Sequence, residues 1–294
     1  TSFPAHRAQV KTLAFDPKRP ILASGGYDEN IILWDISNPQ EVTRAGPFLQ
    51  GHASFVKSLA YHPNGNILAS ASDDKTILFW DVNNPEKTST IGPRYREHLA
   101  AINSIAFHPD GNQLASASND NNVLLWNYHP GNHSLTLDKT LKGHTGFVTA
   151  LTYNTDGSVL ASTGFDSSFI LWDTNTGEPV GLPLHAHTNP INSIAFGKIK
   201  SSNGSSQEYW LSGSSDRTVI QWNLSTYQPV ASRTEAPSGN PEIEVSSGQF
   251  TAKVDGQQIR LNKSTLTGHT GTINSLSFSP QEIDGRLLLA SGSD

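Results

Sequence analysis

Short apolar segments alternate with polar turns along the whole chain, and the arrangement returns at a regular interval. In one unit, apolar segments at 56–61, 67–70 and 76–81 are separated by polar turns at 62–66 and 73–75. The segments are rich in β-branched and aromatic residues, and the turns are rich in Pro, Gly, Asn and Asp, which is typical of strands and hairpins. No segment keeps the period of an amphipathic helix. The pattern predicts an all-β protein made of repeated antiparallel hairpins.

The spacing of the Trp and His residues gives the length of the repeat. Trp34, Trp80, Trp126 and Trp172 follow one another at steps of 46 residues, and Trp222 follows after 50. A histidine stands 28 residues before each of the first four tryptophans, and two later histidines continue the series. A period of this length is the size of one β-propeller blade. The repeat histidines are His6, His52, His98, His144, His187 and His269.

The residues at these offsets resemble the WD40-repeat family. Gly-His, Leu-Ala-Ser, Ser-x-Asp-x-Thr-Ile and Trp-Asp follow one another in the unit 51–81, and related units cover nearly the whole chain. The resemblance implies an all-β, WD40-type β-propeller with seven blades, each a four-stranded antiparallel sheet. The strong similarity between units also looks like the WD40 arrays of bacterial multidomain proteins, in which the array acts as a sensor or scaffold.

We expect one propeller domain over residues 1–294. The last two blades depart from the repeat: the sixth lacks both the histidine and the tryptophan, and the seventh is incomplete. Strands are expected at 242–245, 250–254 and 258–261 in the sixth, with a hairpin turn at Asp255-Gly256, and at 273–278 and 287–291 in the seventh. The expected blades are 6–51, 52–97, 98–143, 144–186, 187–232, 233–268 and 269–294, closed by an N-terminal strand at 1–5.

The family resemblance implies one hydrogen-bonded set of Asp, His, Ser and Trp in each regular unit. A buried Trp N–H, a Ser hydroxyl and a His ring each need a partner, and a turn Asp can supply the acceptor. The expected sets are Asp28/His6/Ser24/Trp34, Asp74/His52/Ser70/Trp80, Asp120/His98/Ser116/Trp126, Asp166/His144/Ser162/Trp172 and Asp216/His187/Ser212/Trp222.

The resemblance also implies partner-binding positions on the top face, three and five residues after each repeat histidine and immediately before each turn Asp. Strand alternation agrees, because the residue four after each histidine is apolar and points inward, so its neighbours point elsewhere. Large aromatic residues near lysines and amides at these positions are typical of a protein-binding hot spot. The candidates are Gln9, Lys11, Tyr27, Phe55, Lys57, Asp73, Asn103, Asn119, Phe147, Thr149, Phe165, Asn192 and Asn274.

Composition narrows the classes of partner. The net charge is −6, and no run of Lys or Arg is long enough to follow a phosphate backbone, so we expect no nucleic acid partner. No apolar stretch is long enough to cross a membrane, so we expect no membrane partner. The absence of Cys fits a reducing compartment, and we expect a cytoplasmic, monomeric propeller without a metal or cofactor. Because the chain begins at Thr1 and contains no Met, we interpret it as part of a longer signalling or regulatory protein.

We consider three hypotheses for the function. The leading hypothesis is a non-catalytic scaffold or sensor that binds a protein or peptide on its top face. The alternative is a reader of a small ligand or modified residue, with aromatic rings caging a cation at the channel mouth. An enzyme is not expected, because the Ser, His and Asp residues recur in every unit, whereas a catalytic site is needed once. His185 and His187 lack a third ligand for a metal.

Overall fold

The computed structural model describes residues 6–38, 41–200, 206–216 and 219–223, and the backbone of six further strands between residues 242 and 293. Every regular element is a strand except one short 3-10 helix, η1 (Pro85–Lys87), among the described residues. The expected closing strand at 1–5 lies outside the described residues.

The strands form seven antiparallel sheets, which we call blades one to seven in chain order. Blade one contains β1 (Val10–Phe15), β2 (Ile21–Gly26), β3 (Asn30–Asp35), β4 (Thr43–Arg44) and β5 (Leu49–Gln50). Blade two contains β6 (Val56–Tyr61), β7 (Ile67–Ser72), β8 (Ile77–Asp81) and β9 (Ser89–Tyr95). Blade three contains β10 (Ile102–Phe107), β11 (Gln113–Ser118), β12 (Asn122–His129) and β13 (Ser134–Lys142). Blade four contains β14 (Val148–Tyr153), β15 (Val159–Gly164) and β16 (Phe169–Asp173).

The remaining blades follow the same meander. Blade five contains β17 (Ile191–Lys200), β18 (Ser206–Ser214) and β19 (Val219–Asn223). Blade six contains β20 (Glu242–Ser247), β21 (Phe250–Asp255), β22 (Gln258–Leu261) and β23 (Ser264–Leu266). Blade seven contains β24 (Ile273–Phe278) and β25 (Leu289–Ser293). The three strands expected in blade six are present, and β23 adds a fourth that the sequence pattern did not indicate.

The expectation of seven four-stranded blades is met only in part: within the described residues, blades one, two, three and six have four or more strands. In blade four the outer segment makes only isolated bridges, between Phe169 and Leu184 and between Trp172 and Pro179. Prolines remove backbone donors from this segment, and Gly181 adopts a left-handed φ of 81°, so a continuous ladder cannot form. The outer segment of blade five lies outside the described residues.

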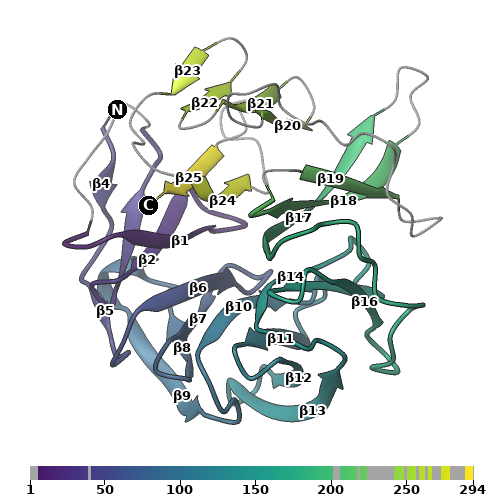
Figure 1. The fold of residues 1–294 in the computed structure, drawn as a ribbon. Helices are drawn as coiled ribbons and strands as arrows, with labels where there is room; N and C mark the ends of the chain where they lie inside the picture. Colours follow the sequence, from purple (N-terminus) through teal and green to yellow (C-terminus); the bar gives the residue numbers. More distant parts are fainter. Residues whose placement is uncertain are drawn as a thin grey trace.

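The blades are arranged around a common centre in a propeller-like manner (Figure 1). The first strand of each blade is innermost, so β1, β6, β10, β14 and β17 lie side by side in chain order. Strand β24 lies beside β1, which brings the two ends of the repeat array together (Figure 1). Residues at the start of each inner strand therefore meet at one end of the centre.

The second strands are longer than the sequence pattern indicated. In blade two, β7 continues to Ser72, two residues beyond the expected end, because Ser72 still pairs with Val56 across a register shift in the inner strand. In blade seven the second strand likewise continues to Ser293, two residues beyond the expected end, with a register shift between Ile273 and Ser275, and the expected residues 287 and 288 lie outside the described residues. A register shift near the start of the inner strand recurs in blades one to five and in blade seven.

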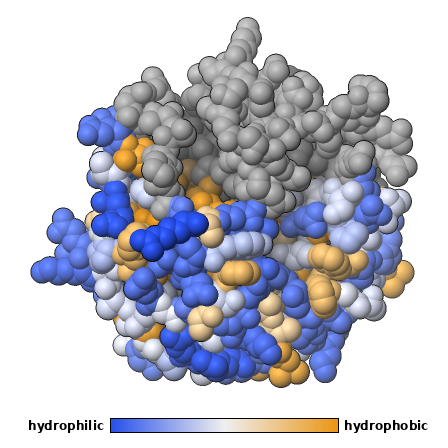
Figure 2. Space-filling view, turned by 60° about the vertical axis from the view of Figure 1, so that its left-hand side comes forward, coloured by the Kyte–Doolittle hydropathy of each residue, from blue (hydrophilic) through white to orange (hydrophobic). Residues whose placement is uncertain are grey.

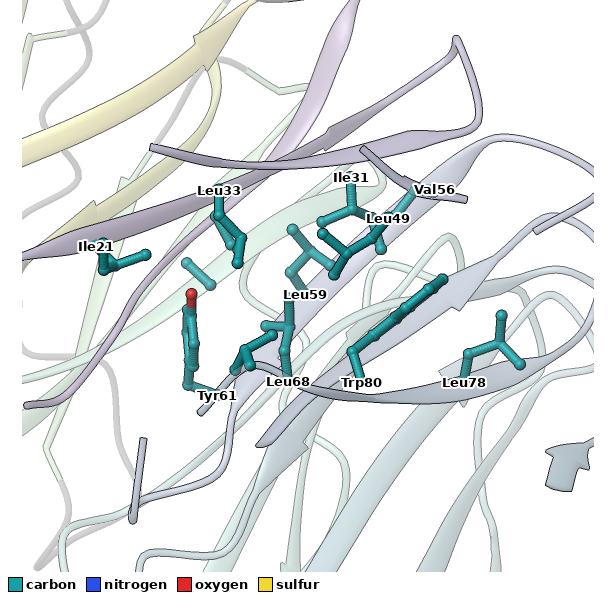
Figure 3. Close-up of a cluster of buried hydrophobic side chains, with 13 residues drawn as sticks. Ile21, Ile31, Leu33, Leu49, Val56, Leu59, Tyr61, Leu68, Leu78 and Trp80 are labelled. Carbon is teal, nitrogen blue, oxygen red and sulfur yellow. The ribbon is translucent and has the colours of Figure 1, made fainter. Parts of the chain in front are cut away.

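The hydrophobic core lies between blades rather than within one sheet. Figure 3 shows the cluster between blades one and two, where Ile31 and Leu33 face Leu59 and Leu68 and the ring of Trp80 closes one side. All are buried, and Trp80 is 2% exposed. Because each blade buries its faces against its neighbours, a single blade cannot form its core alone.

Polar contacts at the lower ends of the inner strands hold adjacent blades together. Arg19 of blade one donates to the Gly65 and Val82 carbonyl oxygens of blade two at 2.6 and 2.9 Å, and also pairs with the buried Asp16. His62 of blade two stands 3.1 Å from the Gly111 carbonyl oxygen of blade three, so its Nε2–H can donate there. These contacts keep the relative positions of the blades, and hence the geometry of their upper ends.

Candidate functional site

Each of the five regular blades contains the same chain of hydrogen bonds. The Trp Nε1–H donates to the Ser hydroxyl at 2.8 Å in all five. The Ser hydroxyl lies 2.7–2.8 Å from His Nε2. His Nδ1 lies 2.8–3.0 Å from the Asp carboxylate. The carboxylate also accepts a backbone N–H from the residue after the histidine, as Asp120 does from Leu99 at 2.9 Å. Each chain ties the turn after the second strand to the loop that enters the blade.

The donors and acceptors of each chain are all used. An ionised carboxylate can only accept, so His Nδ1 carries the proton, and Nε2 is then free to accept the Ser O–H.

Burial alone would raise the pKa of Asp120, but hydrogen bonds from His98 and from the Leu99 and Asn122 N–H groups outweigh it and lower the pKa to about 2. The pKa values of Asp74 and Asp166 are lowered by the same kind of contact. The Asp, His, Ser and Trp of each set therefore have a structural role.

The serines of these hydrogen-bonded sets lie in the interior of the blades. Ser24, Ser70 and Ser162 stand inside the second strands β2, β7 and β15, and each is 2% exposed or less. A Trp N–H and a His ring enclose each hydroxyl, so a ligand cannot reach it without opening the blade. The same holds for the other two serines and for the five tryptophans, all of which are buried; they are Ser116, Ser212, Trp34, Trp80, Trp126, Trp172 and Trp222.

The upper ends of five blades enclose a hollow of about 600 Å³ at the centre of the molecule. Within the part of the chain whose side chains are described, its walls come from the inner strands of blades one to five and from the turns beside them. The lining residues are Lys11, Thr12, Lys57, Ser58, Asn103, Ser104, Asn119, Phe147, Thr149, Ala150, Leu151, Phe165, Asn192, Ser193 and Ile194. We call this feature the central hollow.

The central hollow brings together eight of the candidate partner-binding residues, which are Lys11, Lys57, Asn103, Asn119, Phe147, Thr149, Phe165 and Asn192. Four others, Gln9, Tyr27, Phe55 and Asp73, are not among its lining residues. The side chain of Asn274 lies outside the described residues. The fixed offsets from the repeat histidine and the turn Asp thus select positions in five blades, and these eight positions line one concave surface.

The two lysines lie on adjacent blades. The Lys57 ammonium is 3.2 Å from the Asp73 carboxylate, so the lysine of blade two is paired within its own blade. Lys11 occupies the equivalent position in blade one, 46 residues earlier. Both side chains are only partly exposed. The structure thus places two lysines on this side of the central hollow, one of them in an ion pair.

Two of the candidates are engaged in joining blades. The Asn103 side-chain amide donates to the Val148 carbonyl oxygen of blade four at 2.8 Å and to Asn119 Oδ1 at 2.6 Å. The Thr149 hydroxyl lies between the Thr163 and Ile191 carbonyl oxygens, at 3.0 and 2.5 Å. Their side chains help to build the wall, and this limits what they can offer to a ligand.

A second line of contacts between blades was missed by the sequence analysis. The hydroxyls of Thr12, Ser58 and Ser104 each accept the backbone N–H of a residue in the next blade, at 3.1–3.3 Å. The donors are Leu59, Ile105 and Leu151. The 46-residue spacing of these hydroxyls was the available signal. Ala150 takes the next position and carries no hydroxyl, so this bond is not made to Ile194 of blade five.

The four candidate aromatic residues form two separate pairs. Tyr27 and Phe55 stack across the boundary of blades one and two, with ring centroids 4.4 Å apart and planes 18° apart. Phe147 and Phe165, both in blade four, are tilted at 52° with centroids 5.7 Å apart. The stacked pair leaves no room between its rings for a cation, so the four rings do not form one cage.

Phe147 and Phe165 remain 46% and 54% exposed although they are apolar. Other exposed apolar side chains, such as Leu182, lie away from the central hollow. Figure 2 shows apolar residues as small separate groups on a largely hydrophilic face. Single exposed apolar residues are normal, whereas two neighbouring rings on the wall of a concave site are typical of a binding surface.

Metal sites and membrane-spanning helices are both absent from the described part of the chain. No group of three or more His, Cys, Asp or Glu side chains among those residues could hold a metal ion. His185 and His187 are not brought to a third ligand there, and His187 instead bonds Asp216 and Ser212. No helix among the described residues is long and apolar enough to cross a membrane.

Comparison with known proteins identifies the repeat. The sequence model of the family described as "WD domain, G-beta repeat" matches residues 1–35, 45–81, 90–127, 135–173, 177–223 and 261–294, which is six repeats and most of the chain. Among curated proteins, none matches the chain. The matched segments contain the five hydrogen-bonded chains and the upper ends of the inner strands that line the central hollow. The repeated Asp, His, Ser and Trp geometry and these six matches show that the chain belongs to the WD40 repeat family.

Proposed function

We propose that this chain is a non-catalytic interaction module that binds a protein or peptide at its upper face. The observation that carries the proposal is the central hollow, which gathers positions that vary from blade to blade into one concave surface with two half-exposed phenylalanines. WD40 propellers generally serve as protein-interaction scaffolds, and the family is generally non-catalytic. A rigid sheet scaffold with variable side chains at its loop ends suits recognition.

We further propose a single propeller domain of seven blades, supported by the seven sheets and by the position of β24 beside β1. This domain serves a larger signalling or regulatory protein as a sensor or scaffold, as the likeness of its similar 46-residue units to bacterial WD40 arrays suggests by analogy.

The test is capture of partners from the source cell with three versions of the chain. The versions are wild type, the double variant Phe147→Ala with Phe165→Ala, and the control Leu182→Ala, which removes an 86% exposed side chain outside the central hollow. A partner that is lost only from the double variant supports the proposal. Capture of the same partners by all three versions contradicts it and moves the search to the outer strands.

A further inference from the structure

The lower ends of blades two and three are joined by a buried histidine. His62 follows the inner strand β6, is 5% exposed, and its Nε2 lies 3.1 Å from the Gly111 carbonyl oxygen of blade three. Its other ring nitrogen, Nδ1, lies 3.1 Å from the Asn64 backbone nitrogen. A backbone N–H can only donate, so Nδ1 accepts there and Nε2 carries the proton that is donated to Gly111. The two contacts together therefore require the neutral ring in one tautomer.

The packing around the ring leaves it no second position. A Cβ at Gly111 would lie 2.5 Å from Nε2, so the ring rests directly on the backbone of the next blade. The rings of Phe107 and Tyr128 lie on other sides, with centroids 5.1 and 5.2 Å away. A second proton would sit on Nδ1 and point at the Asn64 N–H. Because both nitrogens belong to one rigid ring, moving Nδ1 away from this donor also moves Nε2 away from Gly111.

The charged groups that face His62 come from blades one and three. Burial lowers the pKa of His62, and the bond to the carbonyl oxygen of blade three opposes this effect. His133 and Lys18 lower the pKa further, whereas the carboxylate of Asp110 raises it. Tyr128 stays neutral, because burial raises its pKa to about 12. The net result is a pKa of His62 below its ordinary value, so the folded protein resists the proton that the unfolded chain accepts.

The equivalent histidine of blade three has a different neighbour. His108 stands 46 residues after His62, and its ring rests on Gly157 of blade four, where a Cβ would lie 1.8 Å from Nε2. Its Nδ1 lies 2.7 Å from the Asp110 carboxylate, which can accept a proton from a charged ring. Asn64 takes the place of Asp110 in blade two. Blade two thus has an amide side chain where blade three has a carboxylate.

We propose that His62 forms an acid-sensitive latch, which holds blade two to blade three while its ring is neutral and releases this boundary when the ring is protonated. The contribution of the latch to stability is fully present above about pH 6.5, where the unfolded chain is neutral at this residue. It is lost as pH falls through the lower pKa of His62 in the folded protein. The boundaries on either side do not depend on this ring.

Three backbone amides report on three boundaries separately. The N–H groups of Leu59, Ile105 and Leu151 each donate to a hydroxyl of the preceding blade, across boundaries one–two, two–three and three–four. Residue-resolved hydrogen exchange of the whole chain, expressed as protection relative to an unstructured chain, is measured at about pH 7.5 and about pH 5. Protection of Ile105 is expected to fall several-fold, and that of Leu59 and Leu151 to change less. The ring of His62, followed by NMR, is expected to titrate below 6.5.

A single substitution tests the chemical cause. Asn64→Asp gives blade two the carboxylate of blade three, and is expected to raise the pKa of His62 and to reduce the acid-induced loss of protection at Ile105. Asn83→Asp adds the same charge at another exposed position of blade two, and as the matched control it should behave like wild type.

Two wild-type results would overturn the inference, and neither depends on the folding of a variant. One is protection of Ile105 that falls no more than that of Leu59 and Leu151. The other is a His62 ring that titrates at or above 6.5. An unchanged acid response of Ile105 in the Asn64→Asp variant would also overturn it, because the release would then not arise from the histidine ring.

Discussion

The hydrogen-bonded chains and the central hollow occupy the same end of the molecule but follow opposite rules. In the chains, the same four residue types recur in five blades with donor–acceptor distances that agree within a few tenths of an ångström. Around the hollow, equivalent positions hold Lys11, Lys57, Asn103, Thr149 and Asn192. Repetition therefore marks what every blade needs for stability, and variation marks what the assembled ring can present to a ligand.

The sharpest test of this comparison substitutes one serine of a hydrogen-bonded set and one serine that bonds a lining residue of the central hollow. Ser116→Ala leaves the Trp126 N–H and the His98 ring without their shared partner in a buried site, and we expect the free energy of unfolding to fall by about 2–4 kcal/mol. Ser215→Ala, which removes only a hydroxyl that accepts from Asn192, is the matched control and should cost about 0.5 kcal/mol or less. Denaturant unfolding measures both, and equal losses would contradict the comparison.

The second prediction concerns the stability of the fold at acidic pH. The pKa of Asp120 is about 2 in the folded protein and near 3.8 when unperturbed, so the unfolded chain binds protons first as pH falls. The contribution of Asp120 is fully present above about pH 4 and is lost as pH falls through about 2. Asp120→Asn should be less stable at neutral pH and lose less stability over this acidic range. Unfolding midpoints measured along the range test this, with the exposed Asp138→Asn as control.

The third prediction concerns the boundaries between blades. Ser58→Ala removes the acceptor of the Ile105 N–H and should cost about 1 kcal/mol. Ala150→Ser makes the reverse change at the boundary that lacks the hydroxyl, and we expect a gain of up to about 1 kcal/mol. Denaturant unfolding measures both, and a serine at 150 that leaves stability unchanged would show that it makes no bond to the Ile194 N–H.

The smallest expected effect on stability comes from replacing the two phenylalanines of the central hollow. Phe147→Ala with Phe165→Ala should change the free energy of unfolding by only about 0.5 kcal/mol, because both rings are half exposed and leave no buried cavity. Partner capture should nevertheless be lost. A large fall in stability would instead show that the pair is a core contact.

Most of the fold could be predicted from the sequence because blades are local structures. The strands of each blade are neighbours in the sequence. The turn residues and the spacing of tryptophans such as Trp80 and Trp126 were therefore enough to divide the sequence into blades. The outer strand of blade four was not predictable in this way. Its pairing depends on Gly181 and the prolines around it, which allow isolated bridges but no continuous ladder.

The candidate site was predicted in part. The offset from the repeat histidine selected eight residues that line one hollow, because that offset measures position along an inner strand. It could not tell that Tyr27 would stack on Phe55, or that Thr149 would bond carbonyl oxygens of two strands. Those contacts join residues of different blades or different strands, and they depend on how closely the backbones approach.

By itself, the sequence determined the strand pattern, the repeat length and the five hydrogen-bonded sets, since all of these arise from residues within one unit. The spacing within the set is the same in the first four units, and the fifth has seven more residues between His and Ser. The tertiary structure decided which side chains of different blades meet. It brought Lys11 and Lys57 to one wall and Phe147 and Phe165 to another, and it paired Tyr27 with Phe55 away from both. The physical reason is that the central hollow belongs to no single repeat and exists only where five blades pack around a common centre.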